Sequence, residues 1–274
     1  MAFFAVDKLK CTGCKTCVAI CPVGILEIDE IQKIPMPVED AEKRCIVCGH
    51  CVAVCPHGAY SLAAMPVEEC KELPQNWAIG FEKFATWVKA RRSFRTFKQE
   101  PVAKEKIERL LDVARYAPSG INLQPVRWLV IQDPAKVREL AGGVISWMRQ
   151  LVDAKAEIAQ MLHFNKMVGT WEQGEDRICR SAPHVLIAAG MKEDITAGQS
   201  CTIALAHLEL AAHAAGLGAC WAGYVHMALL QSDALRKQIG LSHRLNPHGA
   251  MLFGYPRFKY QRIPLRNKAA VVWR

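Results

Sequence analysis

Two cysteine runs with a shared spacing stand in the first quarter of the sequence. CTGCKTCVAICP begins at Cys11 and CIVCGHCVAVCP begins at Cys45, and both follow the pattern CxxCxxCxxxCP. Three thiolates at this spacing can hold three irons of a cubane [4Fe-4S] cluster, and the fourth cysteine of each run ligates the other cluster. The spacing therefore predicts two ligand sets: Cys11, Cys14, Cys17 and Cys55 for one cluster, and Cys45, Cys48, Cys51 and Cys21 for the other.

Zinc ligation and disulfides are the alternatives for these eight cysteines. Structural zinc sites use paired CxxC units, whereas each run places three cysteines ahead of a Cys-Pro. The repeat also extends past the ligands, since CPVGILEI at Cys21 is echoed by CPHGAYSL at Cys55. Two such half-units indicate a module with pseudo-twofold symmetry. Residues 1–65 resemble a bacterial two-cluster ferredoxin, and all eight expected ligands are present.

The length and composition require a second domain after the cysteines. The chain has 274 residues, of which 51% are hydrophobic and 22% are charged, a composition typical of folded globular domains. This length favours about two domains. No apolar run approaches the ~20 residues that span a bilayer, and the start lacks the regions of a signal peptide. Because cluster thiolates also need reducing conditions, we expect a cytoplasmic protein without a membrane segment.

The positive charge of the chain lies in its second part. The net charge is +9, yet residues 1–65 carry six Lys/Arg against seven Asp/Glu, which leaves 29 against 19 for the remainder. A basic domain can bind nucleic acid, but no zinc-finger spacing or groove of alternating aromatic and basic residues is present. The charge therefore favours an anionic cofactor or substrate over nucleic acid, and a solvated basic surface accounts for much of it.

The hydrophobic patterns predict short strands around the cysteines and alternating helices and strands later. Prolines and the absence of an apolar period make residues 66–77 the expected linker. Later helices are indicated by apolar residues at helical spacing, by Pro at a helix start and by Gly at a helix end. The expected strands are 2–7, 25–30, 59–65, 126–134, 184–190 and 248–256, and the expected helices are 81–92, 101–118, one starting near Pro134, weakly patterned turns over 150–180, and 202–218.

Four separated segments could form a binding site for a phosphorylated aromatic cofactor. They are RRSFRTF at 91–97, APSGINLQP at 117–125, GLGACWAGY at 216–224 and GYPRFKYQRIPLR at 254–266. Each alone is weak, but their order and spacing resemble the FMN-dependent nitroreductase family from residue 78 to the end of the chain. The residue types suit FMN, which needs cationic forks at its phosphate, small residues near its ring and polar groups at its pyrimidine edge.

The resemblance implies a role for each matching residue. It assigns the phosphate and ribityl chain to Arg91, Arg92, Ser93, Arg262 and, as a weaker candidate, Lys259. Arg95 would lie near the N1/O2 edge of the flavin, where positive charge stabilises the reduced anion. The PSxxN match would meet the flavin from the partner subunit through Pro118, Ser119, Gly120 and Asn122. Ala222 and Gly223 would present backbone N–H groups to N5 or O4, and Ala222 replaces an acidic residue found in some relatives.

The family resemblance also implies the architecture. We expect an α+β fold with a ferredoxin-type two-cluster module at 1–65, a linker at 66–77 and a nitroreductase-like domain at 78–274, in which helices surround a central mixed sheet and two chains intertwine as a homodimer. No GxGxxG follows a strand and opens a helix, so the dinucleotide fingerprint is missing. Direct use of NAD(P)H stays open, because ordinary relatives bind nicotinamide over the flavin without that motif.

The remaining cysteines and histidines give few catalytic candidates. Cys70, Cys179, Cys201 and Cys220 share no ligand spacing, and most of them are expected to be small buried residues, with Cys220 the one open to a redox role. His184 and His207 lie on apolar segments and favour core roles. His226 is the best candidate proton donor, although hydride would leave flavin N5 and water could protonate the product, so the catalytic residue stays unassigned.

Together these patterns predict an iron–sulfur flavoprotein oxidoreductase. Electrons from a ferredoxin-like or other low-potential donor would pass through two [4Fe-4S] clusters to FMN and on to a nitroaromatic, quinone or similar small electrophile. Residues 150–180 would shape the substrate cover. Two alternatives stay open: a dehalogenase or ene-type reductase on the same fold, and an electron carrier or redox sensor that serves a protein partner.

Overall fold

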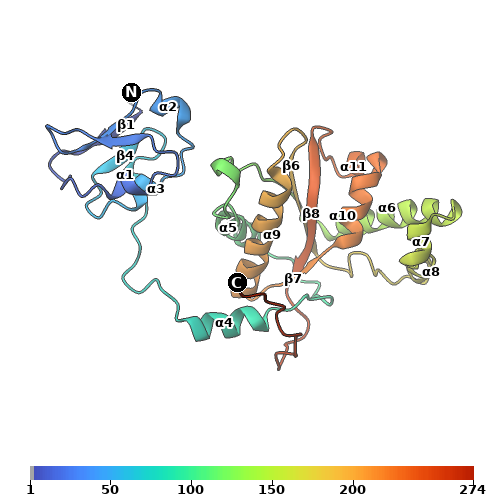
Figure 1. Cartoon of the computed structure of the whole chain (residues 1–274). Coiled ribbons are helices and arrows are strands. Elements are labelled where there is room, and N and C mark those ends of the chain that lie inside the picture. The colour runs from blue at the N-terminus through green and yellow to red at the C-terminus, as the bar shows by residue number, and fades with distance from the viewer. Residues whose placement is uncertain (1–2) are drawn as a thin grey trace. The chain divides into compact units, whose positions relative to one another are not determined.

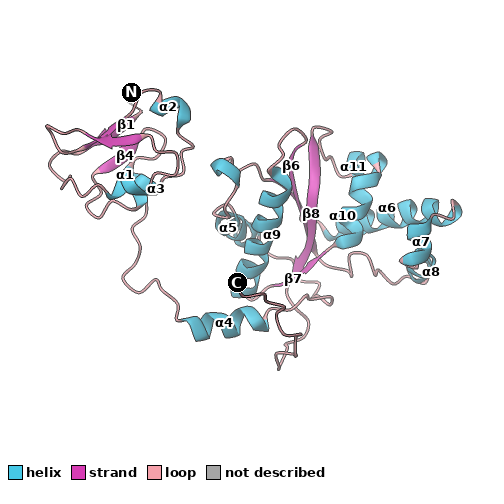
Figure 2. Cartoon of the chain, in the orientation of Figure 1, coloured by secondary structure: helices cyan, strands magenta, loops and turns pink. Residues whose placement is uncertain are grey.

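The computed structural model describes residues 3–274, and contacts within the chain divide it into two units (Figures 1 and 2). The first unit runs to Ala78 and includes Ile121–Leu123, and the second holds Ile79–Gly120 and Gln124–Arg274. No helix within the described range is both long and apolar enough to cross a membrane.

Two small antiparallel sheets frame the cysteine runs in the first unit. β1 (Phe4–Val6) pairs with β4 (Tyr60–Leu62), and β2 (Leu26–Ile28) pairs with β3 (Pro35–Pro37). In the sequence, the short helix α1 (Thr16–Ile20) lies between β1 and β2, and α2 (Ala41–Arg44) and α3 (His50–Ala53) lie between β3 and β4. The 3₁₀ turn η1 (Val67–Glu69) follows β4. The three predicted strands are present in shortened form, although Ala2 of the first lies outside the described residues. β3 was not predicted, because its two prolines argue against a strand.

A four-stranded antiparallel sheet forms the centre of the second unit. Its order is β5–β6–β8–β7, with β5 at Arg127–Ile131, β6 at His184–Met191, β7 at Gly218–Trp221 and β8 at Leu245–Gly254. A parallel bridge from Ser93 to Ala219 and an antiparallel bridge from Phe97 to Pro256 extend the β7 side. A mixed sheet was predicted. Within residues 3–274, the four strands pair antiparallel, and the parallel pairing in this sheet is limited to the bridge between Ser93 and Ala219.

Helices cover both faces of this sheet, because successive strand residues point to opposite sides. Val185 and Ile187 pack on the side of α6 (Pro134–Asp153) and α10 (Gly223–Gln231). Leu186 and Ala188 pack on the side of α5 (Lys104–Ala114) and α9 (Ala197–Ala214). Figure 1 shows α9 and α10 on opposite sides of β8. The others are α4 (Phe81–Ala90), α7 (Glu157–Met161), α8 (Phe164–Glu172) and α11 (Asp233–Gln238).

The helix ends follow the expected signals with small shifts. Asp133 caps α6 by accepting a hydrogen bond from the Ala135 N–H at 2.8 Å, and Pro134 occupies the first turn. α9 ends at Ala214, two residues before Gly216, whose φ of 74° only glycine adopts without strain. α5 begins at Lys104, three residues after the proline expected to open it.

Candidate functional site

The eight cysteines of the two runs surround two separate cavities in the first unit. One cavity is lined by Cys11, Cys14, Cys17 and Cys55. The other is lined by Cys21, Cys45, Cys48 and Cys51. These are the two ligand sets that the spacing predicts, with the fourth cysteine exchanged between runs. Four thiols around each cavity fit the donor set of a [4Fe-4S] cluster, and Tyr60 lines both cavities.

Tight loops with left-handed backbone carry these cysteines. Gly13 has a φ of 67°, and a Cβ there would stand 2.7 Å from the Lys33 carbonyl oxygen, so the loop requires glycine. The Val47 N–H donates to Cys45 Sγ at 3.4 Å, and the Ala59 N–H donates to Cys55 Sγ at 3.2 Å. Such donors to sulfur are among the features that set a cluster's potential.

The thiols differ in the direction in which their pKa is shifted. The Thr16 hydroxyl donates to Cys14 Sγ at 3.3 Å and lowers the pKa of that thiol. Burial instead raises the pKa of Cys51 to about 11 and also raises the pKa of Cys17. Because thiolates are the metal ligands, iron binding has to displace these protons, and the buried cysteines lose theirs least readily without metal.

Three of the four segments predicted for the flavin come together beside β7. The Phe94 N–H donates to the Ala219 carbonyl at 2.9 Å, which joins RRSFRTF to β7. The chain after β8 returns along the same segment, since the Arg257 N–H donates to Thr96 O at 3.2 Å. The rings of Phe94 and Tyr260 lie 5.0 Å apart. Three segments that are far apart in the sequence thus lie together beside β7.

The N-terminus of α10 supplies backbone donors at this place. The Ala222 N–H is taken by Ala250 O at 2.8 Å, and the His226 N–H makes the helix's first bond, to Ala222 O. The N–H groups of residues 223–225 therefore lack an acceptor inside the helix, and no side chain caps them. A Cβ at Gly223 would meet nothing within 4 Å. Open space and free donors fit the polar edge of a flavin.

The basic residues of the predicted site differ in their pairing. Arg91 makes an ion pair with Glu209, with 2.6 Å between Nη1 and Oε1. No ion pair within residues 3–274 involves Arg92, Arg95, Lys259 or Arg262. Arg95 Nη1 donates weakly to Ser93 O at 3.4 Å. The unpaired cations suit a phosphate, and their assignment to FMN stays a prediction.

The APSGINLQP segment does not join the other three within one chain. Pro118 and Ser119 line a small cavity with residues of β5 and α9, and Ser119 Oγ accepts from the Gln124 N–H at 2.9 Å. Asn122 groups with the first unit, where its amide donates to Ile46 O at 3.1 Å and Val47 O at 2.9 Å. The contribution of Pro118, Ser119, Gly120 and Asn122 from a partner subunit stays a prediction.

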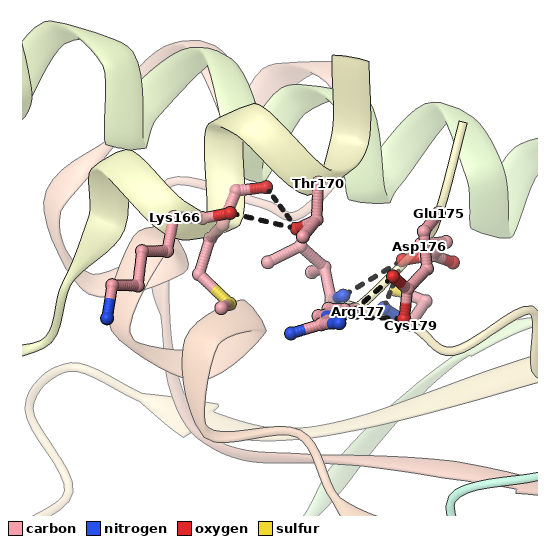
Figure 3. Close-up of polar contacts among 8 residues, drawn as sticks. Lys166, Thr170, Glu175, Asp176, Arg177 and Cys179 are labelled. Carbon is pink, nitrogen blue, oxygen red and sulfur yellow. Dashed lines mark hydrogen bonds and ion pairs between the residues drawn. The ribbon is translucent and has the colours of Figure 1, made fainter. Parts of the chain in front are cut away.

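Two buried carboxylates near these elements were missed from the sequence. Glu209 of α9 holds both Arg91 and the Trp221 indole. Asp176, in the loop after α8, accepts backbone N–H groups from Ile178, Cys179 and Ser181. Figure 3 shows Asp176 close to Cys179. The signal for Glu209 was available, since it is the lone acid in the apolar stretch TIALAHLELAAHAAGLG. Asp176 stands in a polar loop and carried no such signal.

The other singled-out residues are mostly structural. Cys179, Cys201 and Cys220 are buried, and burial raises the pKa of each thiol, which disfavours the reactive thiolate. His184 is fully buried with both ring nitrogens bonded, Nε2 to the Val102 N–H and Nδ1 to Gln132 O, each at 2.7 Å. His226 Nε2 lies 3.2 Å from Pro247 O, and no contact here assigns it a proton.

Comparison with known proteins identifies both parts of the chain. Residues 88–255 match the model of the nitroreductase family. The chain belongs to the nitroreductase family. Residues 10–60 of this nitroreductase-family protein match the 4Fe-4S dicluster domain.

Individual relatives agree with this family. An NADH dehydrogenase of Thermus thermophilus is 31% identical over 67% of this chain and 92% of its own. The iodotyrosine deiodinase of Thermotoga neapolitana is 28% identical over 48% of this chain and 68% of its own. A nitroreductase with bound FMN from Bacteroides fragilis superposes with a TM-score of 0.56 at 21% identity, covering 69% of this chain and 96% of that one.

These findings confirm the predicted family, the α+β fold with its two-cluster module, and the class of enzyme, an FMN-dependent oxidoreductase. The predicted cofactors, FMN and two [4Fe-4S] clusters, are those of the matched domains and the FMN-bound neighbour.

Proposed function

We propose that this protein passes single electrons from a low-potential donor such as ferredoxin through its two clusters, and pairs of electrons through FMN to a small electrophile such as a nitroaromatic or a quinone. The observation that carries the proposal is that one chain combines two four-cysteine cavities with an open, uncapped helix N-terminus beside unpaired arginines. When bound, FMN would accept electrons singly and deliver them in pairs.

The residues of the second unit would bind and orient the cofactor. Arg92, Arg262 and Lys259 would hold the phosphate through charge-assisted hydrogen bonds. The backbone N–H of Gly223 would point to the flavin's polar edge, where the partial positive charge of the α10 N-terminus favours added negative charge. Arg95 would add a full positive charge at the pyrimidine edge.

We propose a homodimer in which each chain completes the other's flavin site. An apolar hollow of about 970 Å³ between α4, α5 and α9 supports this, since Phe84, Trp87 and Val113 line it. Trp273, near the end of the C-terminal tail, is 90% exposed and would be covered in such an assembly. A molar mass near twice that of the chain in light scattering would agree, and a monomer that binds FMN fully would contradict it.

The electron route is tested by cofactor analysis and separate reductants. Anaerobically purified protein should contain about eight irons and one FMN per chain, and reduced ferredoxin should reduce the flavin. Reduction should fail in a Cys14→Ser, Cys48→Ser double variant that keeps its FMN. If that variant is reduced as fast as the wild type, the clusters are not the entry. NADH, the substrate in the name of the Thermus relative, is the competing donor, and fast NADH reduction of the cluster-deficient variant would favour it.

Reductive dehalogenation is a second candidate, favoured by the similarity to iodotyrosine deiodinase. Turnover of halophenols, nitroaromatics and quinones by the same preparation would separate the two reactions. A carrier that serves a protein partner is the remaining alternative, and stopped-flow oxidation of the reduced flavin tests it. Rapid oxidation by small electrophiles argues against a carrier.

We place the reaction in the reducing cytoplasm, where cluster thiolates persist.

A further inference from the structure

α9 contains a buried acid in an otherwise apolar setting. Glu209 is 9% exposed, and its buried neighbours on the helix include Leu205, Leu208 and Ala212. A carboxylate taken out of water is costly unless charges and hydrogen bonds compensate it. The two groups that compensate Glu209 come from two different segments of the predicted flavin site.

One carboxylate oxygen binds Arg91 of RRSFRTF, the arginine motif, and the other binds Trp221, the last residue of β7. Glu209 Oε1 accepts from Arg91 Nη1 at 2.6 Å, and Glu209 Oε2 accepts from Trp221 Nε1 at 3.2 Å. The side chains of Arg91 and Glu209 are 24% and 11% exposed, so solvent screens this pair less than it screens an exposed one. A carboxylate used at both oxygens fixes the relative position of its two partners.

The pairing changes what the arginine motif can do. The charge of Arg91 is neutralised locally, whereas Arg92 and Arg95 make no ion pair within residues 3–274. Trp221 directly precedes Ala222 and Gly223, so holding the indole also holds the backbone that opens α10. We call the arginine motif, Trp221 and the N-terminus of α10 together the flavin cradle. Glu209 lies on α9, outside these segments, and contacts both the arginine motif and Trp221.

We propose that Glu209 is a positioning residue of the flavin site, which fixes Arg91 and Trp221 together and cancels the charge of Arg91 beside the cofactor. The inference deepens the proposed function and rests on FMN binding in this cradle. In the ion pair, the carboxylate of Glu209 cancels the charge of Arg91, so Arg91 only fills its place in the site. Arg92 and Arg95 then provide the positive field at the cofactor. Without the carboxylate, an unpaired guanidinium adds a positive charge near the flavin, which favours the reduced anion.

The test uses two substitutions and a matched control. Glu209→Gln keeps the shape and removes the charge, and Glu209→Leu removes both hydrogen bonds. Glu193→Gln removes one acid from an exposed turn. The measurements on the full chain are the FMN dissociation constant of the flavin-free protein and the midpoint potential of bound FMN. We expect a more positive potential in Glu209→Gln and FMN binding about tenfold weaker in Glu209→Leu, a loss of about 1.4 kcal/mol, because both partners of the carboxylate are released.

A double variant separates positioning from folding. Arg91→Met with Glu209→Leu replaces the buried pair by apolar groups, which is often neutral for stability. It should melt close to the wild type while its FMN binding stays weak. Wild-type potential and affinity in Glu209→Gln, Glu209→Leu and the double variant would overturn the inference and leave the proposed function intact. Failure of the wild type itself to bind FMN would overturn both.

Discussion

Replacing Asp176 by alanine should destabilise the second unit by about 3 kcal/mol. Its Oδ1 accepts from the Ile178 and Cys179 N–H groups at 2.9 and 2.8 Å, and its Oδ2 accepts from the Ser181 N–H at 3.0 Å. Three such bonds at ~1 kcal/mol each give that figure. They also hold Arg180 and Ser181 at φ values of 57° and 51°, a region that non-glycine residues enter at a cost.

The assay is thermal and urea unfolding of the flavin-free protein. For a unit of this size, ~3 kcal/mol corresponds to a fall in melting temperature of about 6–12 °C. Asp176→Asn should lose about a third of that, because the amide nitrogen cannot accept from Ser181. Glu175→Ala is the control, since Glu175 makes an exposed ion pair with Arg177 (Figure 3), which solvent screens and which contributes little to stability. If Asp176→Ala costs no more than Glu175→Ala, the carboxylate does not hold this loop.

Three further predictions follow from single contacts. Burial lowers the pKa of His184. Below about pH 6.5 the unfolded chain therefore binds a proton that the buried ring does not take up, and the stability of the folded protein should fall. In His184→Phe, the urea midpoint should depend less on pH between 7 and 5. A Cβ on Gly218 would stand 2.6 Å from the Phe94 ring, whereas one on Gly223 meets nothing, so Gly218→Ala should cost about 1–3 kcal/mol in melting experiments, while Gly223→Ala should leave flavin-free stability unchanged and weaken FMN binding. Cys55→Ser should reduce iron from about eight to about four per chain by cluster stoichiometry, and an unchanged iron content would contradict the assignment of Cys55 as a cluster ligand.

Local spacing was sufficient to predict the cysteine cavities but not the flavin cradle's supports. A ligand run carries its geometry within a few residues, so the exchange of Cys21 and Cys55 followed from the pattern. β7 was missed because its four residues follow a helix stop without an alternating pattern. The strand exists because β8 pairs with it along Cys220 and Leu252, a contact between distant segments.

The support from Glu209 depends on tertiary distance in the same way. The residues Arg91 and Glu209 are 118 positions apart, and no local pattern links an acid on a helix to an arginine after another helix. The predicted core role of His184 was confirmed for a local reason. A lone histidine on an apolar strand is most readily buried with both ring nitrogens hydrogen-bonded.

The pairing of Ser93 and Phe97 along the β7 side has a further consequence for the life of the protein in the cell. An uncovered edge strand offers its backbone to other chains and promotes aggregation, and here Ser93 pairs with Ala219 of β7 while Phe97 pairs with Pro256 of the returning tail. A chain cut after Gly254 would lose Pro256 and leave the backbone of Phe97 without that partner. Proteolysis of the tail would therefore favour aggregation, and it would also remove Lys259 and Arg262, which we propose as phosphate ligands.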